Sequence, residues 1–211
     1  MKNEKLERRQ GKSRWVKKDE FKRVIQFQES GRHPKRNIAI LYLSFYCGLR
    51  VGEIAKLTLQ DLVNEDWVLR DKADLKKEIT KMKKTREIYI VHKELRVVLT
   101  KHLEERRKQL TTNEVRGWKK QPVFVSQMGN GFSPKSLQMA FKVMFKKVGL
   151  DNMVSSHSGR RSFISNLITQ GVDMKSVSTL AGHASIQTTM DTYASKNPIE
   201  MERVCKALVF E

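Results

Sequence analysis

Hydrophobic residues in the first quarter of the chain recur at the three- and four-residue spacing that is typical of helices. One such pattern spans residues 18–29 and stops at the turn-forming pair Ser30-Gly31. The next, residues 36–47, is apolar on almost every side, as expected for a helix in the centre of a core. A further short helix is predicted in the segment VGEIAKL, residues 51–57.

Between Trp67 and Val91 the hydrophobic period changes towards two. The segment WVLRD is followed by a lysine-rich turn and then by REIYIV, in which Ile88 and Ile90 share one face. Alternation of this kind predicts β-strands. We therefore expect a small three-stranded antiparallel sheet with basic loops.

The rest of the chain returns to helical periodicity. We expect a very basic helix over 93–109, a polar connection over 111–122, and a helix that Pro134 opens and that runs to about Val148. Short helices are predicted over 158–170, 173–181, 185–192 and 199–208. The fold class is accordingly α+β, mostly α-helical with a small three-stranded antiparallel sheet.

The composition of the chain indicates which class of partner it binds. The chain has 211 residues, a formal net charge of +19 and an isoelectric point of about 10.1. A balance this basic favours a polyanion, and nucleic acid is the commonest one. No apolar run approaches the length of a membrane span, and the first residues lack a secretory pattern, so we expect no membrane partner and a cytoplasmic address. The two cysteines, Cys47 and Cys205, make neither a disulfide framework nor a zinc-ligand spacing.

Charge and pattern together divide the chain into three parts. Residues 1–17 form a basic N-terminal arm, residues 18–198 the main folded domain, and residues 199–211 a C-terminal helix or tail.

Several polar side chains occur at positions that the hydrophobic pattern does not explain. Arg50 ends the most hydrophobic segment, His157 and Arg160 lie three apart at a helix start, and His183 precedes Tyr193 by ten residues. Singly, each has an ordinary structural interpretation as a solvated charge, a hydrogen-bonded core histidine or a packed ring. Their order and spacing together point to a site.

Two of these segments resemble motifs of the tyrosine recombinase (phage integrase) family. The family's first arginine motif is similar to FYCGLRVGEIAKLTLQDL, with Arg50 as the arginine and Glu53 at the acidic support position. Its His-x-x-Arg motif is similar to SSHSGRRSFISNLI, which assigns His157 and Arg160.

The closing motif of the family, Leu-x-Gly-His followed by a tyrosine, is similar to LAGHASIQTTMDTYAS, with His183 and the nucleophile Tyr193. All three motifs occur in family order, over about residues 14–205. The resemblance also implies a catalytic lysine on a strand hairpin, for which Lys81 is the best match, with Lys83 and Lys84 close behind. The glycines that commonly flank this lysine are absent here.

What the resemblance implies can be compared with what the chemistry needs. Cleaving a DNA phosphodiester requires a nucleophile, stabilisation of the charge on phosphorus and a proton for the leaving oxygen. No carboxylate cluster suggests a metal site, so we expect no metal and no cofactor, with Arg50 and Arg160 holding the nonbridging oxygens and His183 adding a donor. The resemblance implies His157 as the base and Lys81 as the acid. Glu53 orients Arg50 or His157, or simply forms an i,i+3 ion pair with Arg50.

The expected partner is double-stranded DNA with a specific recombination site. Positive charge on the arm, the hairpin and helix 93–109 would neutralise phosphates. The candidate DNA contacts lie on the hairpin, on the helix after Ser133 and beside the second arginine: Lys83, Lys84, Arg86, Lys135, Ser136, Gln138, Lys142 and Arg161.

The resemblance further implies a homo-tetramer on DNA, a monomer or weak oligomer when free, and possible accessory DNA-bending proteins. In the family a C-terminal helix docks on a neighbouring protomer, whereas intramolecular packing of 199–211 is equally compatible with its pattern. Full-length integrases usually carry a separate domain before the catalytic one, so the chain is either a catalytic-domain-only member or a fragment. A bacterial or phage-encoded, nucleoid-associated protein is expected.

Two alternatives stay open at this point. One is a type IB topoisomerase, which shares the chemistry but relaxes supercoils without exchanging partners. The other is a DNA-binding regulator that keeps the fold without cleaving, although such a protein has no need of Tyr193.

Overall fold

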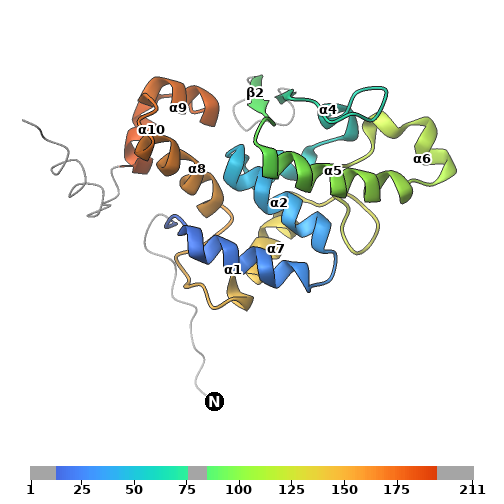
Figure 1. Cartoon of the computed structure of the whole chain (residues 1–211), viewed down its shortest axis with the longest axis horizontal. Coiled ribbons are helices and arrows are strands. Elements are labelled where there is room, and N and C mark those ends of the chain that lie inside the picture. Colours follow the sequence, from blue (N-terminus) through green and yellow to red (C-terminus); the bar gives the residue numbers. More distant parts are fainter. Residues whose placement is uncertain (1–12, 76–84, 194–211) are drawn as a thin grey trace, which may run out of the picture.

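A computed structural model describes residues 13–75 and 85–193 of the chain. Within these ranges most residues are helical, and the helices alternate with short connections (Figure 1). The α-helices are α1 (Lys18–Glu29), α2 (Pro34–Tyr46), α3 (Val51–Lys56), α4 (Leu59–Leu62), α5 (Lys93–Lys108), α6 (Thr112–Arg116), α7 (Pro134–Lys147), α8 (Ser158–Thr169), α9 (Met174–Ala181) and α10 (Ile186–Tyr193). A 3-10 helix, η1, spans Trp118–Lys120.

Helix α2 is the centre of the main core, as its apolar pattern predicts. It packs against α5 and α8, with α1 and α3 also in contact. Its side chains Ile40, Leu41 and Leu43 are almost completely buried. Figure 1 shows α2 crossed by α5, with α1 and α7 below it and α8 leading away towards α9 and α10.

Acidic residues at the third helical position begin several of these helices. Glu20 accepts the backbone N–H of Lys17 at 2.8 Å before α1, and Glu53 accepts that of Arg50 at 2.8 Å before α3. These contacts satisfy backbone donors that have no partner within the helix. In the case of Glu53, the same capping contact places a carboxylate beside a candidate catalytic arginine.

The sheet has two strands in the described residues, so the prediction of three is wrong in this detail. Strand β1 (Lys72–Leu75) pairs antiparallel with β2 (Arg86–Tyr89), and Leu75 lies opposite Arg86. The segment WVLRD does not form the third strand, because the Asn64 side chain accepts the N–H groups of Asp66 and Val68 in a tight turn. The chain after this turn makes only an isolated bridge from Leu69 back to Val63.

The predicted helices within the described residues are confirmed, apart from shifts of one or two residues at their ends. The polar connection over 111–122 is more regular than predicted, since it contains α6 and η1. The predicted helix over 199–208 and most of the arm over 1–17 lie outside the described residues.

Residues 13–17 form a segment, here called the N-terminal strap, that runs against the start of α8. The Ser13 hydroxyl is hydrogen-bonded to that of Ser155 at 2.5 Å, and the backbone N–H of Val16 donates to Ser162 Oγ at 2.9 Å. Val16 is buried in the main core. These last residues of the predicted arm are thus packed on the domain.

Helices α8 and α9 form a second, smaller core around Ile164, Val177 and Ala181. Helix α8 joins this core to the main one by packing closely on α2. A Cβ atom at Gly159 would lie 2.3 Å from Ser44 Oγ and 2.8 Å from the Phe45 ring. The absence of a side chain at Gly159 therefore sets how near α8 can approach α2.

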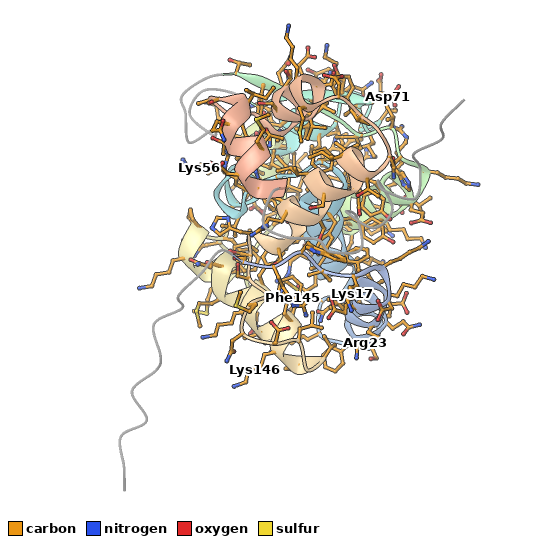
Figure 2. All side chains as sticks on the ribbon, turned by 90° about the vertical axis from the view of Figure 1, so that its left-hand side faces the viewer. Lys17, Arg23, Lys56, Asp71, Phe145 and Lys146 are labelled. Atoms are coloured by element: carbon orange, nitrogen blue, oxygen red, sulfur yellow. The ribbon has the colours of Figure 1, made fainter. Side chains whose placement is uncertain are left out.

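Basic side chains are spread over the outer surface. Lys17, Arg23 and Lys146 lie at the end of the molecule formed by α1 and α7 (Figure 2). In the part of the chain that the structure describes, no helix combines the length and the apolar character that crossing a membrane requires.

Buried His102 on α5 makes the stability of this fold sensitive to pH. Its Nε2 donates to the carbonyl of Val123 at 3.0 Å, and its ring stacks on Phe124 with centroids 4.9 Å apart. Burial lowers the pKa of His102 from 6.5 to about 4. The unfolded chain therefore binds a proton more readily than the folded one, and stability is lost as the pH falls below 6.5.

For this single group, the loss at pH 5 is about 2 kcal/mol. We expect His102→Gln, which keeps a donor for the Val123 carbonyl, to remove that part of the difference in unfolding free energy between pH 7.5 and pH 5. Urea denaturation at both pH values measures it. The exposed His92→Gln is the control and should leave the difference unchanged, and an equal difference in all three proteins would refute the assignment to His102.

Candidate active site

The C-terminal end of α9 presents three consecutive backbone carbonyls, and each accepts a hydrogen bond from a different arginine. The last carbonyls of a helix have no partner within it and carry the negative end of the helix dipole, so they attract cations. The arginines come from the α2–α3 junction, from β2 and from α8. The pairs are Arg86 with Leu180 at 2.6 Å, Arg160 with Ala181, and Arg50 with Gly182 at 3.4 Å.

Arg160 connects the two cores. Its side chain projects from the first turn of α8, where Nη1 donates to the carbonyl of Gly48 at 2.6 Å and Nη2 donates to that of Ala181. The residue is only 5% exposed. Burial, followed by the charges of Arg50 and Arg86, lowers the pKa of Arg160 to about 9, so the group is still charged at neutral pH.

Glu53 is the carboxylate of this cluster and is almost completely buried. Oε1 pairs with Arg50 Nη1 at 2.9 Å, the i,i+3 contact that the sequence left open as one role of Glu53, and Oε2 pairs with Arg86 Nη2 at 2.8 Å. Burial alone would raise the pKa of Glu53, but Arg86 and then Arg50 lower it below its usual value. Three guanidiniums and one carboxylate leave this cluster with a net charge of +2.

Gly182 fits between α9 and Arg86. It adopts a left-handed φ of 61°, and a Cβ atom there would lie 2.3 Å from Arg86 Cδ. Glycine adopts this conformation without strain and leaves the arginine stem its space. Gly182 thereby ends α9 and directs the chain into His183.

His183 is half-buried beside the arginines. Its Nδ1 is hydrogen-bonded to the hydroxyl of Thr189 at 2.8 Å, and Thr189 itself is fully buried on α10. Burial, followed by the charges of Arg160 and Arg50, lowers the pKa of His183 to about 4. The ring is therefore neutral at neutral pH. If the Thr189 hydroxyl donates to Nδ1, the neutral ring carries its proton on Nε2, where it can donate to a ligand.

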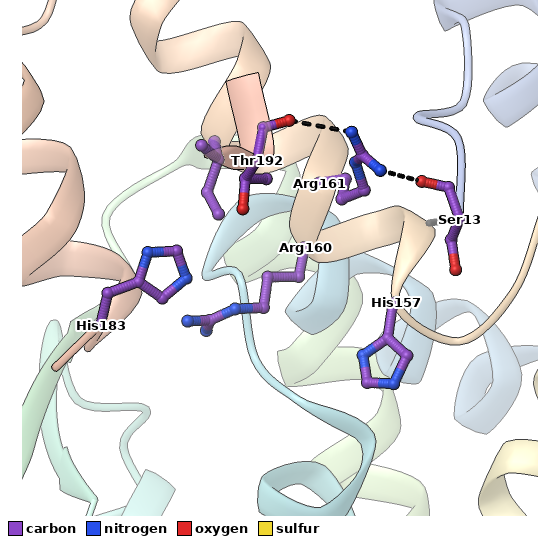
Figure 3. A pocket seen from close by; sticks show the side chains of 7 residues that line it. Ser13, His157, Arg160, Arg161, His183 and Thr192 are labelled. Carbon is purple, nitrogen blue, oxygen red and sulfur yellow. Dashed lines mark hydrogen bonds between the residues drawn. The ribbon is translucent and has the colours of Figure 1, made fainter. Parts of the chain in front are cut away.

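A concave pocket of about 380 Å³ lies over these groups and is lined by Arg160, His183, His157 and Thr192, among others. His157 is the N-cap residue of α8 and is exposed at the pocket (Figure 3). The guanidinium of Arg160 points towards His183, and His157 lies on the other side (Figure 3). A second pocket of about 560 Å³ adjoins it through His183 and is lined by Arg50, Glu53 and Arg86.

Tyr193 is the last residue of α10. Helix α10 packs against α8 and α9, the two helices that carry Arg160 and the three carbonyls. Thr192, which directly precedes Tyr193, lines the same pocket as Arg160, His157 and His183. The end of the tyrosine helix thus lies at the pocket.

The candidate DNA contacts that lie within the described residues separate into two groups. Arg86 and Arg161 are part of the buried framework, since Arg86 pairs with Glu53 and Arg161 donates to the backbone carbonyls of Ser13 and Thr192. The others form an exposed row on α7, which contacts α3: Lys135, Ser136, Gln138 and Lys142. The lysines of the hairpin, Lys81, Lys83 and Lys84, lie outside the described residues.

The sequence did not indicate Thr189 as a site residue, and it indicated Arg86 only as a candidate DNA contact. Thr189 appears in the sequence only as part of a Thr-Thr pair, and Arg86 looks like one more cation on a basic hairpin. The single signal for Arg86 was its place at the start of a strand, where alternation sends Ile88 and Ile90 inwards with it. Among the described residues, no group of three or more histidine, cysteine, aspartate or glutamate side chains could hold a metal ion.

Comparison with known proteins relates this arrangement to one family. Residues 14–200 match the model of the phage integrase family. The tyrosine recombinase XerC of Thermodesulfovibrio yellowstonii is 29% identical over 176 residues, which are 81% of this chain and 54% of that protein. The chain spans about half the length of the curated relatives that it matches.

Solved structures show the same fold. The crystal structure of XerA recombinase superposes with a TM-score of 0.76 at 24% identity, over 96% of this chain and 68% of that one. The XerH site-specific recombinase, bound to a palindromic difH substrate in a post-cleavage complex, gives a TM-score of 0.65 at 20% identity, over 93% and 54%.

The ion-pair cluster predicts a non-additive effect on stability. Glu53→Gln leaves two neighbouring guanidiniums without their carboxylate, and we expect a loss of about 3 kcal/mol in unfolding free energy. The double variant Glu53→Gln/Arg86→Met removes one of those uncompensated charges and should be more stable than Glu53→Gln alone. Urea denaturation at pH 7 measures all of these variants.

The exposed ion pair between Lys72 and Glu87 supplies the control, because Glu87→Gln should cause no measurable loss. If the double variant is as unstable as the sum of its single variants, Glu53 does not act by neutralising Arg86.

Proposed function

The chain belongs to the phage integrase family, and on that premise we propose that it is a site-specific DNA recombinase that cleaves and rejoins DNA through a 3′-phosphotyrosine intermediate. One observation carries the proposal. Arginines from the two arginine motifs of the sequence, Arg50 and Arg160, converge on the end of α9, beside the pocket that the tyrosine helix reaches.

Charge stabilisation is the first role of the site. An attacking phenolate and a phosphodiester together bring two negative charges to the transition state, and the arginine–glutamate cluster carries a net charge of +2. Guanidiniums fixed before the substrate arrives need little reorganisation during the reaction, which makes such stabilisation effective. We assign Arg50 and Arg160 to the nonbridging oxygens, with His183 Nε2 as a further donor.

Proton transfer is the second role. The phenolic oxygen of Tyr193 attacks phosphorus and gives its proton to His157, while the bond to the 5′ oxygen breaks. The leaving 5′ oxygen takes a proton from a lysine, for which we propose Lys81. The products are a 3′-phosphotyrosine and a free 5′-hydroxyl. Attack by the 5′-hydroxyl of a partner strand reverses the step, so rejoining needs no external energy source.

Partners and organisation follow as part of the proposal. The substrate is double-stranded DNA with a specific recombination site, and a homo-tetramer binds it. Accessory DNA-bending proteins assist the assembly. The proposed division is a basic arm over 1–17, a catalytic domain over 18–198 and a docking segment over 199–211. The exposed polar row of α7, Lys135, Ser136, Gln138 and Lys142, is the proposed surface for base contacts. A cytoplasmic location suits this task.

A DNA duplex nicked near the cleavage site tests the chemistry directly, because the short fragment that carries the freed 5′-hydroxyl diffuses away. Without this hydroxyl the strand cannot be rejoined, and the covalent intermediate accumulates. We expect a protein–DNA adduct that survives denaturant with the wild-type chain and that is absent with Tyr193→Phe. The control is Tyr46→Phe, since Tyr46 lies on α2 and bonds Glu94 rather than the pocket. Gel electrophoresis under denaturing conditions gives the yield.

Adduct formation by Tyr193→Phe, or its absence in the wild-type chain while DNA binding persists, would overturn the mechanism. Exchange between two sites distinguishes a recombinase from an enzyme that only relaxes supercoiled DNA.

The general acid can be identified with DNA whose bridging 5′ oxygen is replaced by sulfur. A thiolate leaves without protonation, because its conjugate thiol is far more acidic than an alcohol. We expect the Lys81→Ala variant to cleave the oxygen substrate about 10²–10⁴-fold more slowly than the wild-type chain. The same variant should cleave the sulfur substrate at a nearly wild-type rate. Lys83→Ala and Lys84→Ala are the matched controls, and rescue of one of these variants instead would move the role to that lysine.

A further inference from the structure

Arg161 bridges two segments that are far apart in the sequence. One guanidinium nitrogen, Nη1, donates to the backbone carbonyl of Ser13 in the N-terminal strap, and Nη2 donates to that of Thr192 on α10 at 2.9 Å (Figure 3). The side chain is half-buried, and burial lowers the pKa of Arg161 from its usual value. Arg161 loses part of its hydration when it binds these two carbonyls. Its contacts therefore fix the position of one carbonyl relative to the other.

The carbonyl of Thr192 lies at the critical end of α10. Tyr193 follows at once and is the last residue of the helix. A cation at a helix C-terminus binds carbonyls that lack partners within the helix and interacts favourably with its dipole. Arg161 therefore fixes the last turn of the tyrosine helix to α8, which also carries Arg160.

The carbonyl of Ser13 is fixed from the other side. The strap is attached to the loop before α8 by the backbone bond from Arg14 N–H to the Met153 carbonyl at 2.9 Å. It is attached to α8 itself by the bond from Val16 N–H to Ser162 Oγ at 2.9 Å. The position of the Ser13 carbonyl is thus fixed as long as the N-terminal strap is bound to α8 and to the loop before it.

We propose that Arg161 is a positioning residue that ties the tyrosine end of α10 to the N-terminal strap, so that the seating of the strap sets the approach of Tyr193 to the phosphate. The proposal rests on the proposed function, because it concerns the same nucleophile. The planar guanidinium is suited to the task, since it presents donors in fixed directions to two separate acceptors, whereas an ammonium group cannot hold the same geometry.

The alternative role for Arg161 is a direct contact with a DNA phosphate. That role predicts a different loss, because removing a phosphate contact weakens DNA binding and reduces its salt dependence. Loss of positioning instead slows the chemical step at saturating DNA and leaves the affinity unchanged. The two roles are therefore separated by measuring binding and cleavage independently.

The first experiment compares Arg161→Gln and Arg161→Lys with the wild-type chain on nicked DNA. We expect Arg161→Gln to slow single-turnover cleavage at saturating DNA by about ten- to hundredfold, the range for a small misplacement of a reacting group. Arg161→Lys keeps the charge and one donor and should recover part of the rate. The dissociation constant for DNA should not change in either variant.

A matched variant controls for a merely structural effect. Arg36 is another buried arginine that donates to a backbone carbonyl, that of Val125 at 2.9 Å, between α2 and the segment before α7. Arg36→Lys should leave the cleavage rate unchanged at a temperature where thermal denaturation shows every variant to be folded. A rate loss in Arg36→Lys equal to that in Arg161→Lys would overturn the positioning role.

The link to the strap is tested through Ser162, whose hydroxyl seats Val16. Ser162→Ala should slow cleavage in the wild-type background and have no further effect in the Arg161→Gln background, because both changes break the same connection. Equal effects in the two backgrounds would overturn the coupling. An unchanged cleavage rate in Arg161→Gln refutes the inference alone, whereas the absence of any adduct with the wild-type chain refutes the proposed function first.

Discussion

The structure depends on one electrostatic constraint: three positively charged guanidinium groups lie close together in a largely buried site. The end of α9 meets it with the carbonyls of Leu180, Ala181 and Gly182, one for each arginine. Partial charges at a helix terminus satisfy the donors without cancelling the charge. Among the described residues, Glu53 is the carboxylate that pairs with these arginines, and it bonds two of them at once. The result is a site in which each of the three arginines has a carbonyl acceptor and the net charge is still positive.

This constraint also explains how the two cores are joined. Among the described residues, the buried apolar side chains of the small core are Ile164, Val177 and Ala181, and polar contacts add to the packing of α8 on α2 that joins it to the main core. Arg160 spans the gap by binding Gly48 on one side and Ala181 on the other, and Arg86 binds Glu53 and Leu180 in the same way. Gly159 lets α8 come close enough to α2 for these side chains to reach. The groups that we propose for catalysis are thus also the groups that hold the cores together.

The sequence predicts much of this fold and part of the site. The periodicity of α1, α2, α5 and α7 is strong because each has one face or all faces in the main core, and the motif residues Arg50 and Arg160 stand out against it. What it cannot predict is which backbone atoms accept their hydrogen bonds, because a carbonyl is the same at every residue. For the same reason Arg86 and Arg161 look like surface cations until the fold brings acceptors to them. The prediction of a third strand is wrong for a local reason, since the hydrogen-bonded turn at Asn64 competes with the pairing of a β-strand.

Stability and chemistry set opposite demands on such a site. A second carboxylate beside Arg160 would neutralise its charge and strengthen the fold, as paired buried charges are far less costly than unpaired ones. It would also occupy the donors and cancel the field that a phosphate needs. Burial, followed by the charges of Arg50 and Arg86, lowers the pKa of Arg160 to about 9, which reflects the energetic cost of holding this charge away from water. In the proposed complex a DNA phosphate would offset that cost, so the charges that the free protein holds at an energetic cost are the ones that we propose to bind DNA.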